Sequence, residues 1–261
     1  MLGSQRNNAK LIRAALGEIP ADAILAGAKL INVYSGEILD GWEVSILDDR
    51  ICYVGPSAKH TRGKETEILD VAGMYLSPGF IDGHTHIGHY ARPFENLQSF
   101  LPRGTTALMA SCDEFAAVFG NRGLQFFLDD VERHPLRVHT LISMTAPQDP
   151  LLCSTASLTD EEIASALGDP RVLGLGEIVS WLRLLQCDEE ILRRIELAQR
   201  GGRMIQGHTA GARDRKLCAV AATGVSSCHE PINLDDAIER LRLGYWTMLR
   251  EGSLRQISKR R

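Results

Sequence analysis

The chain has 261 residues, of which 44% are hydrophobic and 24% charged, and it carries a net charge of −4. This composition excludes a disordered or fibrous chain, and the balance of 29 basic against 33 acidic residues disfavours nucleic acid and anionic membranes as partners. Ten prolines and 24 glycines indicate many turns between short elements, which favours an α/β fold over a helical bundle.

The cysteines and the polarity of the N-terminus bear on the compartment. No C-x-x-C pair occurs among the six cysteines, so we expect free thiols and a cytoplasmic protein. The first ten residues are polar, and no stretch approaches the ~20 consecutive apolar residues of a membrane span. We therefore expect neither an export signal nor a membrane anchor, and homo-oligomer formation stays open.

The N-terminal segment, residues 1–77, has the pattern of a small β domain. Residues 9–16 can form a short helix, with apolar side chains on one side. Apolar runs then alternate with turn residues such as Asp48-Asp49, which is typical of short strands joined by hairpins; the runs span 24–33, 44–47 and 51–54.

From residue 78 onward, strands alternate with helices, which predicts parallel βα units. Thr159 and Glu162 form a capping box at the start of one helix, and Asp188 and Gly201 mark the ends of another. Seven strands are expected, at 79–82, 106–110, 138–143, 172–175, 203–206, 225–227 and 245–249. Periodicity alone leaves open whether they form a doubly wound sheet or a closed barrel.

A pair of histidines ends the first of these strands, in the sequence Pro-Gly-Phe-Ile-Asp-Gly-His-Thr-His-Ile at 78–87. Because alternate residues of an extended strand face the same side, His84 and His86 can bind one metal ion together. An H-x-H pair alone fits two structural histidines equally well.

Three further residues of metal-binding type follow later strands: Glu177, His208 and His229. In a barrel, all five side chains would meet at the mouth formed by the carboxyl ends of the strands. Four imidazoles and a carboxylate suit a pair of borderline transition-metal ions, which can activate water for hydrolysis. The sequence therefore predicts a two-metal hydrolytic site.

Several motifs resemble the adenine deaminase branch of the amidohydrolase superfamily. The segment 78–87 resembles the first-strand metal motif of the superfamily, and the later motifs occur in the order of that branch, at 176–177, 207–211, 227–230, 241–244 and 250–253. The resemblance extends from about residue 24 to 253. It implies a distorted (β/α)₈ barrel and a small β domain to which both chain ends contribute.

The resemblance also implies roles for the five residues. His84 and His86 would bind one ion, His208 and His229 the other, and Glu177 would bridge both, as well as being the candidate catalytic residue. The metals would be two divalent ions, with manganese favoured over iron or zinc. The reaction would be the hydrolysis of adenine, a small purine base, to hypoxanthine and ammonia.

The sequence departs from this branch at two places near the expected substrate pocket. Gly88-His89-Tyr90 replaces the usual Glu-Ser-Ser, and Cys112-Asp113-Glu114 replaces Pro-His-Glu. We expect four residues near these motifs to contact the substrate: His89, Asp113, Glu114 and Glu230. Two alternatives stay open, namely an amidohydrolase that acts on a cyclic amide, and a non-catalytic fragment that at most binds metal or associates with other chains.

The C-terminal segment lacks one feature that the resemblance implies, the aspartate of an eighth strand. Residues 254–261 are basic and aperiodic, so we expect an atypical tail and an incomplete barrel of about seven strands over 78–253. Unpaired sheet edges would then favour association, and deamination of adenine by this chain would be impaired. The charges Glu239, Arg240 and Arg242 are expected on a solvated helix face.

Overall fold

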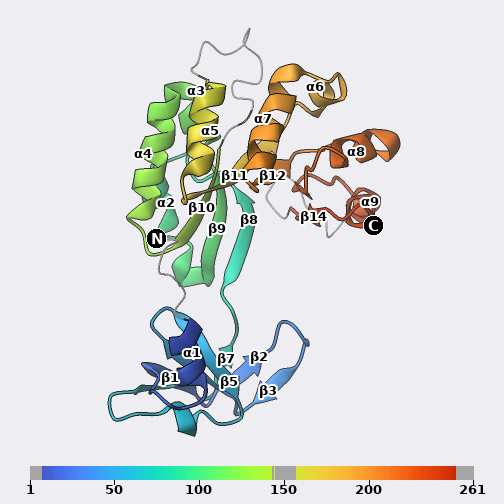
Figure 1. Cartoon of the computed structure of the whole chain (residues 1–261). Helices are drawn as coiled ribbons and strands as arrows, with labels where there is room; N and C mark the ends of the chain where they lie inside the picture. Colours follow the sequence, from blue (N-terminus) through green and yellow to red (C-terminus); the bar gives the residue numbers. More distant parts are fainter. Residues whose placement is uncertain (1–7, 143, 145–156, 251–261) are drawn as a thin grey trace. The chain divides into compact units, whose positions relative to one another are not determined.

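The computed structural model describes residues 8–142, 144 and 157–250, and it divides the chain into two compact units, Met1–Gly79 and Phe80–Arg261 (Figure 1). The predicted strand 138–143 and the predicted tail 254–261 therefore lie partly or wholly outside the described residues. None of the helices in the described ranges is long and apolar enough to cross a membrane.

The first unit consists of short strands in two small sheets, as its alternation of apolar runs and turns predicts. One sheet has the order β5-β4-β1-β6 and the other β3-β2-β7. The elements are α1 (Asn8–Ala15), β1 (Ala23–Ala26), β2 (Lys29–Ile31), β3 (Ile38–Asp40), β4 (Glu43–Leu47), β5 (Arg50–Gly55), β6 (Glu67–Asp70) and β7 (Tyr75–Leu76). Asp48 has a φ of 54°, which a short aspartate tolerates in the tight turn between β4 and β5.

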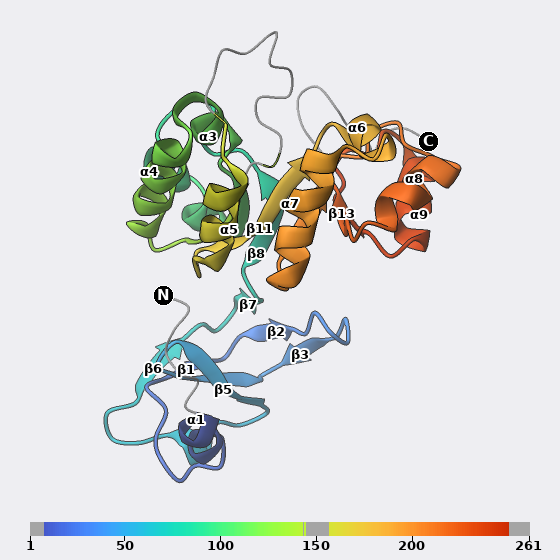
Figure 2. The same ribbon diagram turned by 45° about the horizontal axis from the view of Figure 1, so that its top comes forward.

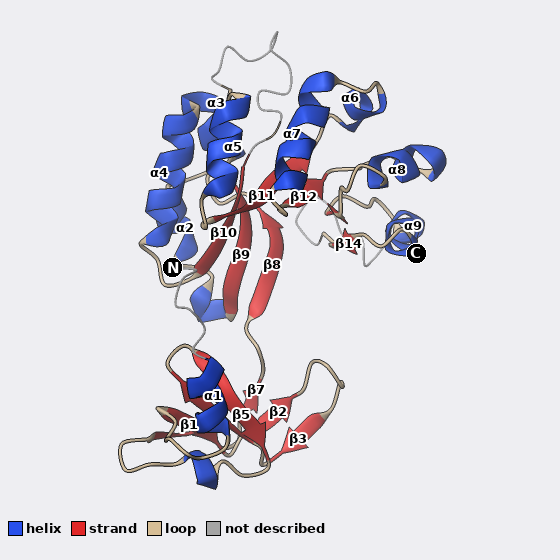
Figure 3. Ribbon diagram, in the orientation of Figure 1, coloured by secondary structure: helices blue, strands red, loops and turns tan. Residues whose placement is uncertain are grey.

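The second unit is built on one parallel sheet of seven strands (Figure 3). Its strands are β8 (Phe80–Thr85), β9 (Thr105–Ser111), β10 (Arg137–Ile142), β11 (Val172–Ile178), β12 (Met204–Gly207), β13 (Ser227–Cys228) and β14 (Trp246–Thr247). They pair in strict sequence order from β8 to β14. A doubly wound sheet would reverse its order at a switch point, so this order identifies the barrel type of winding.

The sheet curls strongly enough to bring its first and fifth strands together. Gln206 of β12 donates a hydrogen bond from Nε2 to the carbonyl oxygen of Gly83 in β8, at 3.0 Å, although three strands lie between them in the sheet order. The result is a half-barrel. Within the described residues, β8 and β14 form its two edges and are paired on one side only.

Helices cover the outer face of the sheet and bury the core (Figures 1 and 2). Helix α4 packs against β10, α7 against β11 and β12, and α9 against β14. The helices of this unit are α2 (Pro93–Leu97), α3 (Asp113–Phe119), α4 (Asn121–Glu132), α5 (Asp160–Gly168), α6 (Trp181–Leu185), α7 (Glu189–Arg200), α8 (Asp214–Ala221) and α9 (Leu234–Arg242). Phe127, Leu175 and Ile191 are fully buried between the two layers.

The two helices with clear end signals form as predicted. Thr159 and Glu162 make the capping box of α5: the threonine side chain accepts from the Glu162 N–H, and the Glu162 carboxylate accepts from the Thr159 N–H at 2.9 Å. Asp188 caps α7 by accepting from the N–H groups of Glu190 and Ile191, and Gly201 ends it.

Replacing Thr159 by Ala is expected to lower the free energy of unfolding by about 1 kcal/mol, because the Glu162 N–H loses its partner at the start of α5. The measurement is urea denaturation followed by circular dichroism. Thr159→Ser keeps a capping hydroxyl and serves as the control. Equal stability of the Ala and Ser variants would show that the cap contributes nothing.

Candidate metal centre

The five predicted ligands all lie at the carboxyl ends of the parallel strands. His84 is the second-last residue of β8, and His86 follows that strand directly. His208 and His229 come immediately after β12 and β13. Glu177 lies inside β11, which extends to Ile178 and is therefore longer than the sequence predicts. The curl of the sheet brings the ends of these four strands to one place.

The carboxylate of Glu177 lies between two pairs of histidines. Its Oε2 atom is 2.7 Å from His208 Nδ1 and 3.0 Å from His229 Nε2. Its Oε1 atom is 3.3 Å from His86 Nε2, which is 3.1 Å from His84 Nε2. Oε1 thus faces His86, while Oε2 faces His208 and His229 and also lies 4.0 Å from His84 Nε2.

The electrostatics of the metal-free site follow from this arrangement. Burial would raise the pKa of Glu177, but hydrogen bonds from His208, His229 and His86 outweigh burial and hold that pKa well below its usual range. Burial, together with the neighbouring His229, lowers the pKa of His84 to about 4. At neutral pH, His84 is therefore uncharged and has a lone pair to offer, while the glutamate is ionised.

The second histidine of the pair behaves differently because two carboxylates flank it. Burial would lower the pKa of His86, but hydrogen bonds to Glu114 and Glu177 outweigh it and raise that pKa to about 10. His86 Nδ1 is 2.8 Å from Glu114 Oε1. Without a metal ion, His86 therefore carries a second proton at neutral pH, which a cation would have to displace.

The four expected substrate contacts differ in their positions. Asp113 brings a carboxylate oxygen within 4.8 Å of ligand atoms of His86 and Glu177, and burial raises its pKa to about 6. His89 is half exposed beside His86, with its Nε2 atom 3.0 Å from Glu114 Oε1. Glu114 is thus engaged with both histidines. Glu230 is buried, and its negative charge is balanced by an ion pair with Arg250.

Gln206 contacts a candidate ligand, and the sequence did not predict this contact. Gln206 Oε1 is 2.8 Å from His84 Nδ1. Gln206 lies on β12 two residues before His208, and this alternate spacing at a strand end is the sequence signal that could have identified it.

The expectation for Arg240 is wrong: it is fully buried, not solvated. Its guanidinium donates to the carbonyl oxygens of Thr209, Ala212 and Asp236 and to the sulfur of Cys228, and so connects the segments that follow β12 and β13. Because α9 also presents Arg242 to solvent, charge alone did not distinguish the two arginines.

The donor set fits a pair of divalent transition-metal ions. Four ring nitrogens surround one ionised carboxylate whose oxygens face both histidine pairs, and imidazole and carboxylate are the ligand types that zinc, iron and manganese share. Ligand atoms of His84, Glu177 and His229 lie within 4.8 Å of one another, close enough for a single ion to contact all three.

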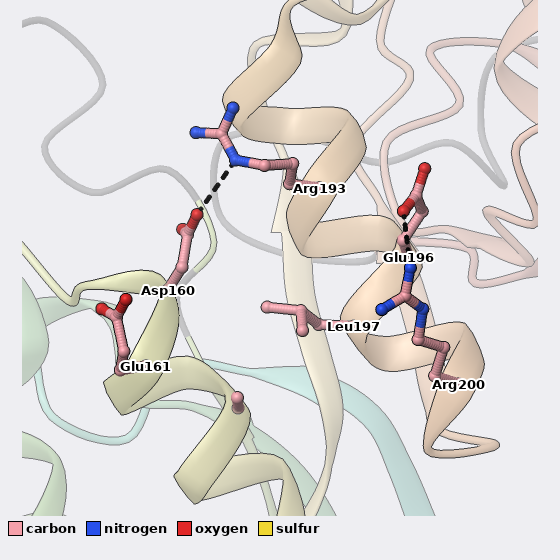
Figure 4. Close-up of a pocket in the computed structure, with 7 residues that line it drawn as sticks. Asp160, Glu161, Arg193, Glu196, Leu197 and Arg200 are labelled. Carbon is pink, nitrogen blue, oxygen red and sulfur yellow. Dashed lines mark hydrogen bonds and ion pairs between the residues drawn. The ribbon is translucent and has the colours of Figure 1, made fainter.

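A separate groove between α5 and α7 shows no comparable arrangement (Figure 4). Its volume is about 350 Å³. Arg193 and Asp160 pair across it at 3.2 Å, and Arg200 pairs with Glu196 at 3.3 Å. Since these charges satisfy each other on the protein surface, we assign no ligand to this groove.

Comparison with solved structures identifies the class to which the fold belongs. A putative prolidase from Bifidobacterium longum superposes with a TM-score of 0.57 over 86% of this chain and 57% of its own, at 18% identity. A dihydroorotase superposes with a TM-score of 0.54 over 86% of this chain and 64% of its own, at 14% identity. The fold is that of the amidohydrolase-superfamily enzymes. No family model matches the sequence.

Adenine deaminases are more similar in sequence to this chain than the two solved structures are. The chain is 39% identical over 96% of its length to an adenine deaminase from Cenarchaeum symbiosum, and 37% identical over 94% to one from Moorella thermoacetica. It is a relative of the adenine deaminases, as the motifs predict. It spans 41% of the length of each of these two proteins.

The affinity of the chain for zinc is expected to rise with pH between about pH 6 and 8. The pKa of His86 is raised to about 10, so a metal ion binds there only by displacing a proton; each proton released makes the apparent affinity about tenfold higher per pH unit. Competition with a chromophoric chelator at several pH values measures this slope. An affinity that does not change with pH would contradict it.

Proposed function

We propose that His84, His86, Glu177, His208 and His229 hold two divalent metal ions, one at each histidine pair. The observation that carries the proposal is the position of the Glu177 carboxylate, with Oε1 toward His86 and Oε2 toward His208 and His229. Manganese is the metal that the resemblance favours, and the donor set also suits iron and zinc.

We further propose that the protein to which this chain corresponds deaminates adenine to hypoxanthine and ammonia. The support is the 39% identity to an adenine deaminase over nearly the whole chain, together with a donor set suited to hydrolysis. Bound metal ions would supply an activated water molecule at neutral pH. Glu177 would help to hold both ions, and His89 and Asp113, beside His86, would contact the substrate.

Activity is best tested on two proteins, because the chain spans 41% of these relatives. One is the 261-residue chain and the other is a chimaera that joins it to the remaining part of the adenine deaminase it matches. Both are loaded with manganese and incubated with adenine, and ammonia release is followed. We expect turnover by the chimaera, and a loss of at least about 100-fold on Glu177→Gln, since that change weakens the bridge between the ions.

Glu196→Gln is the matched control, because Glu196 lies on the outer helix α7, where it pairs with Arg200. This variant should keep full activity. The competing substrate is a cyclic amide, whose ring opening is followed in parallel. Hydrolysis of the cyclic amide alone would overturn the adenine proposal, and metal-loaded protein that hydrolyses neither compound would favour a binding role.

We also propose a cytoplasmic location and a role in purine metabolism. The location is supported by four described cysteines that form no disulfide, Cys52, Cys187, Cys218 and Cys228. Cys112 and Cys228 are buried next to the candidate site, as expected for small apolar side chains. The metabolic role follows from the proposed substrate.

A further inference from the structure

We infer that Gln206 and Glu114 are positioning residues, which fix the ring orientations of His84 and His86 so that each Nε2 atom faces the metal centre. The inference rests on the proposed two-metal site and extends it. A neutral imidazole has one N–H and one lone pair, so the partner of its second nitrogen decides which nitrogen can bind metal.

The orientation of the Gln206 amide follows from its partners. Its Nε2 atom is 3.0 Å from the carbonyl oxygen of Gly83, and a carbonyl can only accept a hydrogen bond. The NH₂ group must therefore point to Gly83, which leaves Oε1 facing His84 Nδ1 at 2.8 Å. Because Oε1 can only accept, His84 Nδ1 must carry the proton. The lone pair of His84 is then on Nε2, the atom that faces His86 and Glu177.

Glu114 fixes the orientation of the His86 ring as Gln206 fixes that of His84, but its acceptor is a charged carboxylate instead of a neutral amide. An ionised carboxylate can only accept, so the contact of 2.8 Å requires a proton on His86 Nδ1. His89 approaches the same Oε1 atom at 3.0 Å, and its ring stacks on that of His86 with 5.1 Å between centroids. Glu114 is thus held on two sides, and His86 Nε2 faces Glu177 at 3.3 Å.

The two positioning residues lie at the ends of two different strands, Gln206 within β12 and Glu114 shortly after β9. Gln206 lies on β12 and His208 directly follows that strand, so one strand end supplies both the candidate ligand His208 and the hydrogen-bond partner of His84. Glu114 lies in the first turn of α3, directly after β9. An amide partner and a carboxylate partner also make the two rings unequal, since the carboxylate increases the basicity of its histidine more.

Zinc affinity tests the inference in the full chain. Glu114→Ala and Gln206→Leu are each expected to weaken zinc binding by about 10- to 100-fold, the usual effect of removing the hydrogen-bond partner of a ligating histidine. Glu114→Gln keeps an acceptor oxygen but not the charge, so its loss should be smaller than that of Glu114→Ala. The matched controls are Glu196→Ala and Gln98→Leu, which change exposed side chains on α7 and after α2 and should leave the affinity unchanged.

The protonation of the rings tests the inference without any variant. Nitrogen-15 spectra of histidine-labelled, metal-free chain should show a proton on Nδ1 of both His84 and His86. On zinc addition, the Nε2 resonances should shift while the Nδ1 protons remain. Gln206→Glu, which keeps an acceptor near His84, is the second variant if Gln206→Leu does not fold, and it should retain the Nδ1 proton of His84.

The outcomes separate the inference from the proposed function. A wild-type chain that binds no zinc overturns the metal centre, and with it the expected affinity losses. Zinc binding through Nδ1 in the wild type would overturn the positioning roles and leave the metal centre intact. Unchanged zinc affinity in Glu114→Ala and Gln206→Leu would do the same. The inference is supported if the wild type has a proton on Nδ1 of both His84 and His86, and if Glu114→Ala loses the Nδ1 proton of His86.

Discussion

Replacing both His84 and His208 by Ala is expected to reduce the bound zinc or manganese from two ions per chain to almost none. The double variant removes one proposed ligand from each histidine pair, which leaves His86 and His229 as the histidines beside Glu177. Protein-bound transition metals depend on a small number of ligands, so one lost imidazole per ion is a large fraction of each set. Elemental analysis of the purified protein after gel filtration measures the content.

The control for this experiment is a second double variant, His60→Ala with His134→Ala. These histidines form hydrogen bonds with the backbone, His60 with the carbonyl oxygen of Ala15 and His134 with the N–H of Leu136, and neither belongs to the candidate centre. The control should bind as much metal as the wild type. Unchanged metal content in the His84 and His208 double variant would show that the ions bind elsewhere.

Replacing Arg240 by Ala is expected to lower the free energy of unfolding of the second unit by about 3 to 5 kcal/mol. The change removes the donors to the carbonyl oxygens of Thr209, Ala212 and Asp236 in a place where the arginine has no exposed surface. Buried acceptors left without a partner are costly, and the lost side chain also leaves a cavity. Urea denaturation measures the change.

Arg240 also lies next to the segments that carry two candidate ligands. Thr209 follows His208, and Cys228, whose sulfur is 3.4 Å from Arg240 Nε, precedes His229. We therefore expect Arg240→Ala to weaken zinc binding as well. Arg242→Ala is the matched control, because Arg242 is an exposed arginine of the same helix. Equal stability of the two variants would show that the buried guanidinium is dispensable.

Much of the fold could be predicted from the sequence, because it depends on residues near each other in the chain. All seven predicted strands of the second unit occur in order, and the capping box at Thr159 forms as expected. Such signals depend on local hydrogen bonds and on side-chain periodicity. The ligand candidates could be found for the same reason, since His84, His208 and His229 each lie at or after the end of a recognisable strand.

What the sequence determined by itself was therefore the series of elements and the residue types at the strand ends. Only the tertiary structure decided the curl of the sheet, the burial of Arg240 and the partners of the ligands. Gln206 meets His84 across 122 residues of chain, and Glu114 meets His86 across 28. These contacts depend on how seven strands bend together, and a local pattern does not encode that bend, because the same alternation of strands and helices suits both an open sheet and a barrel.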